Sequence, residues 1–125
     1  MTSRRPELVP RAVRQAVEDT VGGWGLYTKG QIADLFRNEG FARDENYVGA
    51  GGERKQMAGS FHAAIDFSSA SEVDRYLRVV EQVLDDHDTD SERATRDRLI
   101  RVMRRSGIDL DERGRLKLTA PRSLG

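Results

Sequence analysis

The sequence contains no cysteine and only two histidines, His62 and His87, among its 125 residues. Without cysteine the chain cannot form disulfides, thiolate metal sites or a thiol nucleophile. With two histidines, it has few members from which to build a nucleophile-and-base pair or a histidine-rich metal site. A chain free of cysteine also suits a reducing compartment, and we expect it in the cytoplasm.

Long apolar runs are lacking as well. No stretch approaches the roughly 18 consecutive apolar residues of a membrane-spanning helix. Arg4 and Arg5 form a twin arginine, but Glu7 and Arg11 interrupt the apolar segment that an export signal needs. We therefore expect neither secretion nor contact with a membrane.

A net charge is also absent, because 21 basic residues offset 21 acidic ones. No global field steers the protein toward nucleic acid or an anionic membrane, so only local patches can favour such partners. With 37% hydrophobic and 34% charged residues, the chain should fold and carry a heavily charged surface. Its length fits one domain, which we place at residues 1–118, followed by a flexible tail or the start of a linker at 119–125.

The densest apolar pattern lies between Ser69 and Asp86. Ser69 and Glu72 have the spacing of a capping box, which marks the start of a helix. We expect this amphipathic helix to form the floor of the core, with the other elements packed across it. Six apolar residues recur on one of its faces, at a spacing of three and four: Val73, Tyr76, Leu77, Val80, Val83 and Leu84.

The rest of the chain completes a mainly α fold, a compact bundle of four to five short helices with a C-terminal β-hairpin. Alternating apolar and polar residues predict the hairpin from Ile108 to Leu118. Weaker periodic patterns predict helices at about Val9–Val21, Lys29–Glu39, Glu53–Phe67 and Ser91–Ser106. The third of these helices turns Met57, Phe61, Ala64 and Ile65 inward. The predicted core includes Val13, Val17, Ile32, Leu35, Phe36, Phe61, Ile65, Leu77, Val80, Leu84, Leu99 and Met103.

Glycines mark the ends of two of these helices. Three of them surround Trp24, the only tryptophan, which we expect to plug the edge of the core rather than to contact a partner. Gly40 is placed to close the second helix in the left-handed conformation, and Phe41 is placed to fold back onto that helix.

A glycine-rich loop precedes the third predicted helix. Gly51 and Gly52 lead into a first turn that holds Arg54 and Lys55, so backbone amides and the positive helix end could bind an anion there. The phosphate-loop pattern is not met, because no Gly-Lys-Ser/Thr follows at the required spacing. A flexible connector is the alternative interpretation.

The acidic run from Asp85 to Asp90 spaces its carboxylates like a calcium loop. Ser91 stands where the turn of such a loop needs glycine, and Arg93 stands where the loop needs an apolar residue. We interpret the run as helix caps and acidic first-turn residues. We expect no metal and no cofactor.

The search for an active site is negative. His62, beside Phe61, is interpreted as a partly buried structural histidine. The intervals between Arg54 and His62 and between Arg78 and His87 exceed the spacing of the HEPN-type ribonucleases. We therefore expect that the chain is not an enzyme and has no catalytic residue.

The most informative charge feature is the segment from Glu92 to Leu118, where nine basic residues stand against five acidic ones. A basic helix followed by a basic hairpin is typical of a winged-helix protein on DNA, but the acidic turn at Asp109–Glu112 lies where phosphates would lie. A solvated arginine face is the other interpretation. The residues expected to bind a partner or nucleic acid are Arg98, Arg101, Arg104, Arg105, Arg113, Arg115 and Lys117.

Three stretches, at residues 25–41, 73–84 and 98–116, together resemble the small N-terminal helical domain of bacterial abortive-infection-type (phage-defence) proteins. The resemblance lies in pattern and order, and it assigns no catalytic residue. It implies a non-catalytic interaction or sensing module that works with a protein partner or a fused effector domain. Self-association is a further expectation, with the acidic run of one copy against the arginine-rich helix of another.

Overall fold

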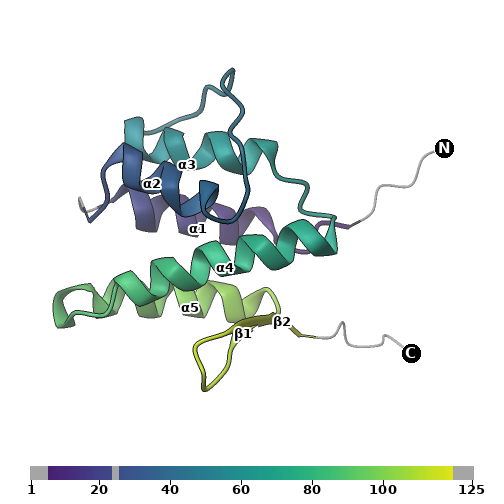
Figure 1. Cartoon of the computed structure of the whole chain (residues 1–125). Helices are drawn as coiled ribbons and strands as arrows, with labels where there is room; N and C mark the ends of the chain where they lie inside the picture. Colours follow the sequence, from purple (N-terminus) through teal and green to yellow (C-terminus); the bar gives the residue numbers. More distant parts are fainter. Residues whose placement is uncertain (1–5, 24–25, 120–125) are drawn as a thin grey trace.

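A computed structural model describes residues 6–23 and 26–119 of the chain (Figure 1). The prediction of a mainly α fold with a terminal hairpin is confirmed. Trp24, predicted to plug the core, lies outside the described residues. Within them the elements are α1 (Arg11–Gly22), α2 (Lys29–Arg37), α3 (Glu53–Ala64), α4 (Ala70–Asp86), a short 3-10 turn (Asp90–Glu92), α5 (Arg93–Arg105), β1 (Ile108–Leu110) and β2 (Leu116–Leu118).

The predicted central helix is present as α4, and all six residues of its apolar stripe are buried. Ser69 caps it by accepting a hydrogen bond from the amide of Glu72 at 3.4 Å. The capping box is only half formed, because the Glu72 carboxylate accepts from the amide of Asp66 at 3.2 Å and not from that of Ser69. This contact joins the start of α4 to the end of the preceding connection.

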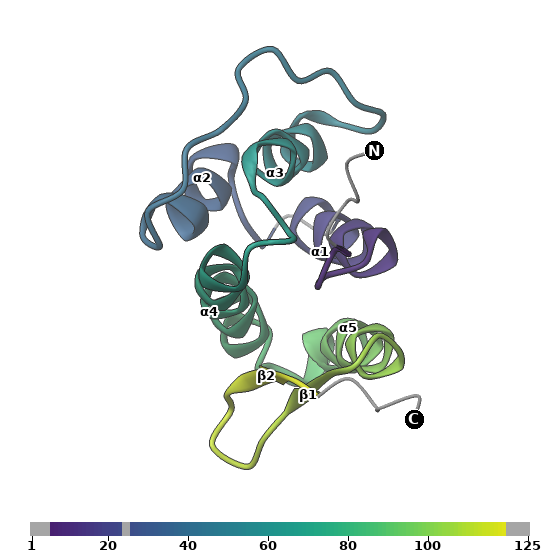
Figure 2. The ribbon, with the colours of Figure 1, turned by 90° about the vertical axis from the view of Figure 1, so that its right-hand side faces the viewer.

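The helices are arranged in two groups that share one core. α1, α2 and α3 pack together on one side, and α4 and α5 run beside one another on the other side (Figure 1). Seen along the bundle, α1 lies between α3 and α5, while α4 lies between α2 and the hairpin (Figure 2). All twelve residues predicted for the core are buried, and the Phe36 and Phe61 rings stack there with centroids 4.7 Å apart.

The predicted end of α3 was wrong by three residues. The helix stops at Ala64 because Asp66 forms a local turn, accepting hydrogen bonds from the amide and hydroxyl of Ser68 at 3.0 and 2.6 Å. Ile65 becomes extended and remains buried, whereas Ala64, predicted to face inward, is exposed.

The other helix ends lie close to their predicted positions. Gly40 adopts a φ of 85°, and the amide of the buried Phe41 donates back to the carbonyl of Phe36 at 3.1 Å. A 3-10 turn precedes α5, which ends at Arg105 before Gly107. No helix among residues 6–23 and 26–119 is long and apolar enough to cross a bilayer.

The hairpin is antiparallel and pairs Ile108 with Leu118 and Leu110 with Leu116. Ile108 and Leu116 point into the core, so the hairpin closes the open end between α4 and α5. Gly114, with a φ of 80°, makes the turn.

Candidate functional site

The arginine face of α5, which we define as Arg98, Arg101, Arg104 and Arg105, follows from the periodicity of the helix. Leu99, Ile100 and Met103 are buried, so the four arginines lie on the opposite, exposed side. Their side chains form no ion pair or hydrogen bond with any of the described residues. The structure therefore brings these four predicted site residues together as an open cationic surface.

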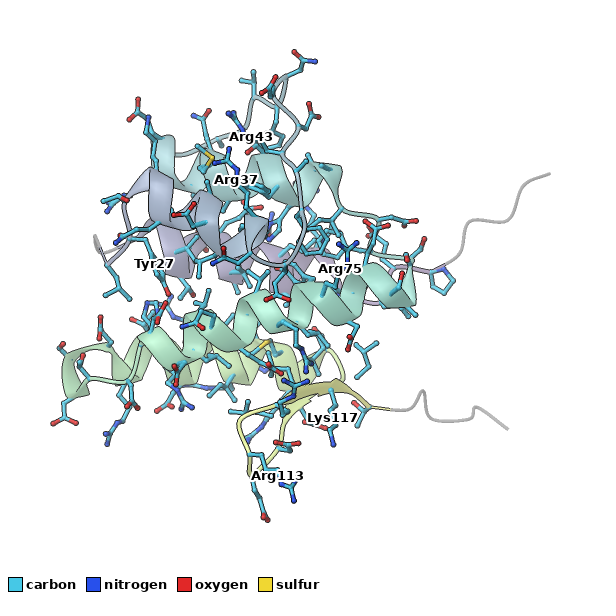
Figure 3. All side chains as sticks on the ribbon, in the orientation of Figure 1. Tyr27, Arg37, Arg43, Arg75, Arg113 and Lys117 are labelled. Atoms are coloured by element: carbon cyan, nitrogen blue, oxygen red, sulfur yellow. The ribbon has the colours of Figure 1, made fainter. Side chains whose placement is uncertain are left out.

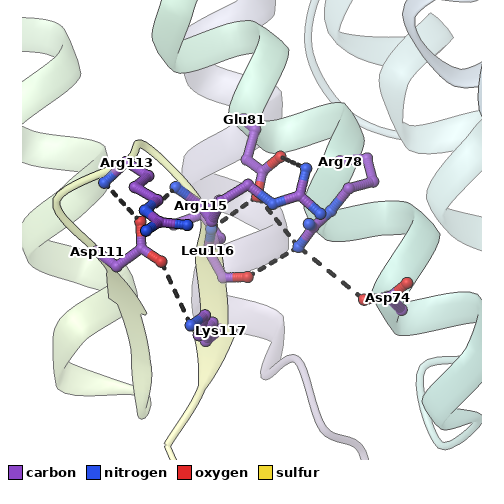
Figure 4. Close-up of polar contacts among 8 residues, drawn as sticks. All are labelled: Asp74, Arg78, Glu81, Asp111, Arg113, Arg115, Leu116 and Lys117. Atoms are coloured by element: carbon purple, nitrogen blue, oxygen red, sulfur yellow. Dashed lines mark hydrogen bonds and ion pairs between the residues drawn. The ribbon is translucent and has the colours of Figure 1, made fainter.

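The three basic residues predicted on the hairpin differ in their surroundings. Figure 4 shows Arg115 paired with Glu81 at 3.6 Å and Lys117 paired with Asp111 at 3.4 Å. Arg113 lies near the hairpin tip, where its side chain is exposed (Figure 3). Two of the three cations are thus partly neutralised within the protein.

Asp111 organises the hairpin turn. Its carboxylate accepts hydrogen bonds from the amides of Arg115 and Arg113 at 2.9 and 2.8 Å. The bond from the Arg115 amide, followed by the bond from the Arg113 amide and the ion pair with Lys117, holds the pKa of Asp111 below its ordinary value. This carboxylate therefore stays ionised beside the hairpin cations.

The relation of α5 to its neighbours departs from that of a reading helix. In a helix-turn-helix the two helices cross steeply, whereas α4 and α5 run alongside one another in both views (Figures 1 and 2). The connection between them is a loop and a 3-10 turn, in which the Thr89 hydroxyl donates to Glu92. The hairpin that follows α5 is present as predicted, and the helix that packs most closely against α5 is α1.

The predicted anion-binding loop does not direct its cations at one point. Gly52 caps α3 through its backbone, and the carbonyl of Gly51 accepts from the Gln56 side chain at 2.9 Å. Arg54 instead donates to the carbonyls of Tyr27 and Gly23 at 3.4 and 3.3 Å, which ties α3 to the connection between α1 and α2. Lys55 pairs with Asp19 of α1 at 2.6 Å.

The acidic run from Asp85 to Asp90 is divided among structural contacts. Asp86 accepts hydrogen bonds from the Tyr27 hydroxyl at 2.7 Å and from Gln82 at 2.9 Å. Burial and the bond to Asp86 raise the pKa of Tyr27. Asp90 pairs with Arg93 at 3.1 Å. No group of three or more metal-ligating side chains converges within residues 6–23 and 26–119.

A chain of three hydrogen-bonded side chains crosses the bundle, and sequence reasoning missed it. His62 of α3 lies 2.7 Å from the Glu18 carboxylate of α1 through Nδ1 and 2.8 Å from the Tyr76 hydroxyl of α4 through Nε2. A carboxylate can only accept, so Nδ1 carries the proton and the Tyr76 hydroxyl donates to Nε2. Burial lowers the pKa of His62, more strongly than the Glu18 contacts raise it, and burial raises the pKa of Tyr76.

The Glu18–His62–Tyr76 cluster has the order of a carboxylate–histidine–hydroxyl triad, but it lacks the access to substrate that a catalytic triad needs. The Tyr76 side chain is 0% exposed and lies among core aromatic rings, so no substrate atom can reach its hydroxyl. The arrangement instead links α1, α3 and α4 through one polar contact. His62 is 5% exposed, so it is buried rather than partly buried as predicted, and its structural role stays a prediction.

A polar groove of about 640 Å³ opens above His62, between α1 and α3. Its walls include Arg11, Arg14 and Lys55, with Tyr47 from the loop before α3. A second groove of about 390 Å³ lies between α1 and α5, beside Arg98 and Arg105. Neither groove follows from a local motif, because each is built from residues on helices that are far apart in sequence.

Comparison of the chain with protein-family models, curated proteins and solved structures finds no match.

Proposed function

We propose that this chain is a non-catalytic interaction module of a bacterial phage-defence system of the abortive-infection type, and that it works in the cytoplasm through protein–protein contacts. The arginine face of α5 binds an acidic surface of the partner protein or of a fused effector domain. The observation that carries this proposal is the exposure of four neighbouring arginines that have no side-chain partner among the described residues. The three stretches that resemble abortive-infection-type proteins support the proposal that the module belongs to a phage-defence system.

Electrostatics favours a binding role for this face. Arg101 and Arg105 are four residues apart on the helix, so their like charges destabilise α5 slightly. Asp97, the one acidic residue of α5, is exposed and makes no ion pair with the described residues. An acidic partner relieves this repulsion and is steered toward the face by complementary charge.

The groove between α1 and α5 adds apolar contact area to the same surface. Arg98 and Arg105 border it, and Ala16, Leu99 and Val102 contribute to its lining. A surface that combines an apolar floor with a cationic rim is suited to a protein segment that carries both apolar and acidic side chains.

Winged-helix-like DNA binding is the second candidate, favoured by the direct passage from α5 into a hairpin with the exposed Arg113. Two observations favour the protein-contact proposal over it. α4 runs alongside α5 instead of crossing it. Two of the hairpin cations, Arg115 and Lys117, are already paired with Glu81 and Asp111.

Charge reversal at Arg101 tests both candidates. Arg101→Glu should abolish co-purification with the protein encoded next to this chain, while Arg37→Glu should leave it intact. Arg37 is a matched control because it is exposed, lies on α2 and has no side-chain partner among the described residues (Figure 3).

The same proteins are then titrated with mixed-sequence duplex DNA across salt concentrations, by fluorescence anisotropy. Tight binding that weakens steeply with salt and disappears in Arg101→Glu would replace the protein-contact proposal with DNA binding. Light scattering at low and high salt distinguishes a second copy of the chain as the partner, because self-association through the acidic run dissociates as salt is added.

A further inference from the structure

One wall of the groove between α1 and α3 is the loop before α3, which hydrogen bonds hold in place. The loop before α3 is fastened by the amide of Asp44, which donates to the carbonyl of Ser60 at 2.8 Å, and by Arg43, whose Nε donates to the Ser60 hydroxyl at 3.2 Å. Tyr47 packs over Gly59, where an added Cβ would lie 2.7 Å from the tyrosine ring. Glycine at position 59 is therefore what allows this aromatic side chain to lie against α3.

The two acidic side chains of the groove are already engaged. Glu18 accepts from His62 at 2.7 Å, and Asp19 is paired with Lys55 at 2.6 Å. His62 donates through Nδ1 and accepts through Nε2, so it is neutral and adds no charge to the floor. The charge of Asp19 is thus offset by Lys55, while Glu18 is held by its hydrogen bond with the histidine.

The hydrogen-bonding groups that remain free in the groove are mostly donors. Arg11 and Gln15 are exposed, and neither their side chains nor the Tyr47 hydroxyl has a partner among the described residues. Arg14 pairs with Glu7 at 2.9 Å and stacks on Phe67, yet its Nε is buried without a hydrogen-bond partner. A buried donor that is left unpaired is unfavourable, and an acceptor placed nearby would relieve it.

We propose that the groove between α1 and α3 is a binding site for a small molecule that carries a phosphate or carboxylate group. Arg11 supplies the free guanidinium for this group, the Tyr47 hydroxyl donates a hydrogen bond to the same group, and Gln15 contacts the rest of the ligand. The volume of about 640 Å³ is in the range of small-molecule sites. The four residues of the arginine face lie outside this groove, although Gln15 and Asp19 line both it and the neighbouring groove between α1 and α5.

The experiment is a titration of the ¹⁵N-labelled chain, followed by NMR, with inorganic phosphate and with acetate at constant ionic strength. We expect at least one of the two anions to shift the amides of residues 11–19, 44–52 and 55–63 in a saturable manner. Shifts with phosphate alone identify a phosphorylated ligand, and shifts with acetate alone identify a carboxylate ligand. Saturable shifts with neither anion would overturn the proposal.

Variants decide whether the shifts report this site. Arg11→Gln should weaken binding by roughly tenfold or more, because it removes a charge-assisted hydrogen bond. Arg37→Gln removes the same charge from an exposed arginine of α2 and should leave binding unchanged. Equal weakening by both variants, or none in Arg11→Gln, would show that the anions only screen surface charge and would overturn the proposal.

Tyr47→Phe gives a second measurement that keeps the aromatic wall. It should weaken binding while the melting temperature stays that of the parent, since the lost hydroxyl has no partner in the described part of the protein. The arginine face of α5 is unaltered in all these variants. A failure of this proposal is therefore distinguishable from a failure of partner binding, which Arg101→Glu tests.

Discussion

His62 illustrates how a residue acquires its properties from its surroundings. It is 5% exposed, and its two ring nitrogens are both used, one by Glu18 and the other by Tyr76. Arg14 also acts on it, and this positive charge lowers the pKa of His62 further. The side chain is therefore held neutral, as a bridge between helices.

This environment predicts a pH dependence of stability. The pKa of His62 lies below its ordinary 6.5 in the folded protein, so below that pH the unfolded chain takes up a proton that the folded chain resists. The free energy of unfolding should fall as pH decreases from 7 toward 5, by up to about 1.4 kcal/mol per pH unit. Urea denaturation at a series of pH values measures this slope.

His62→Gln separates this contribution from the rest of the protein. The variant retains the buried His87 and all carboxylates, so the difference between its slope and that of the parent belongs to His62. We expect the flatter slope in the variant. Parallel slopes between pH 7 and 5 would contradict the assignment of a depressed pKa.

The basic residues show how far the candidate site could be predicted. Their positions in the sequence predicted an arginine face, because Arg98 and Arg101 fall on the side of the helix opposite its apolar residues. The same reasoning could not tell Arg101 from Arg115, because the carboxylate that pairs with Arg115 is Glu81, on a different element. Whether a basic side chain is free to bind a partner thus depends on the packing of elements that are far apart in the sequence.

At the scale of elements, the hairpin docks on α4 through the backbone of one residue. The amide of Leu116 donates to the Glu81 carboxylate at 2.7 Å, and the Leu116 carbonyl accepts from Arg78 at 2.8 Å (Figure 4). Arg78 and Glu81 also pair with each other at 3.1 Å. These contacts satisfy the outward-facing backbone groups of Leu116 on β2, which would otherwise be free to pair with another strand.

Removing the Glu81 carboxylate should loosen the hairpin. Glu81→Ala leaves the Leu116 amide without its acceptor and Arg78 with Asp74, 4.0 Å away, as its remaining counter-ion. We expect a cost of about 1–3 kcal/mol in the free energy of unfolding. Chemical denaturation measures the loss, and hydrogen exchange should be faster at the amides of residues 108–118.

Glu81→Gln retains an oxygen that can accept from Leu116 and should recover part of the stability. Glu45→Ala, at an exposed loop position, serves as the control and should change little. A Glu81→Ala protein as stable as the Glu45→Ala protein would mean that the hairpin does not depend on this contact.

At the scale of the molecule, one continuous core joins the five helices and two strands found within residues 6–23 and 26–119. Leu77 of α4 is 3% exposed within that core, and the adjacent Tyr76 contacts Phe36 of α2 and His62 of α3. A core of this kind should unfold as one cooperative unit.

A charge placed in that core should therefore unfold the entire described domain. Leu77→Asp buries a carboxylate without a partner, at a cost of roughly 5 kcal/mol or more, which is comparable to the total stability of a small domain. Circular dichroism should show loss of helix for this variant at 25 °C. The same substitution at Val48, which is 88% exposed, should leave both the spectrum and the melting temperature close to those of the parent.

The sequence by itself determined the helical class, the central helix, the terminal hairpin and the core residues. Each depends on periodicity, helix caps and glycines that lie within a few residues of one another, so local sequence patterns are enough to predict it. Tertiary structure alone decided the Glu18–His62–Tyr76 chain, the groove beneath Tyr47 and the pairing of Arg115 with Glu81. Glu18 and His62 are 44 residues apart, and they meet only because α1 and α3 bury their apolar faces against a common core.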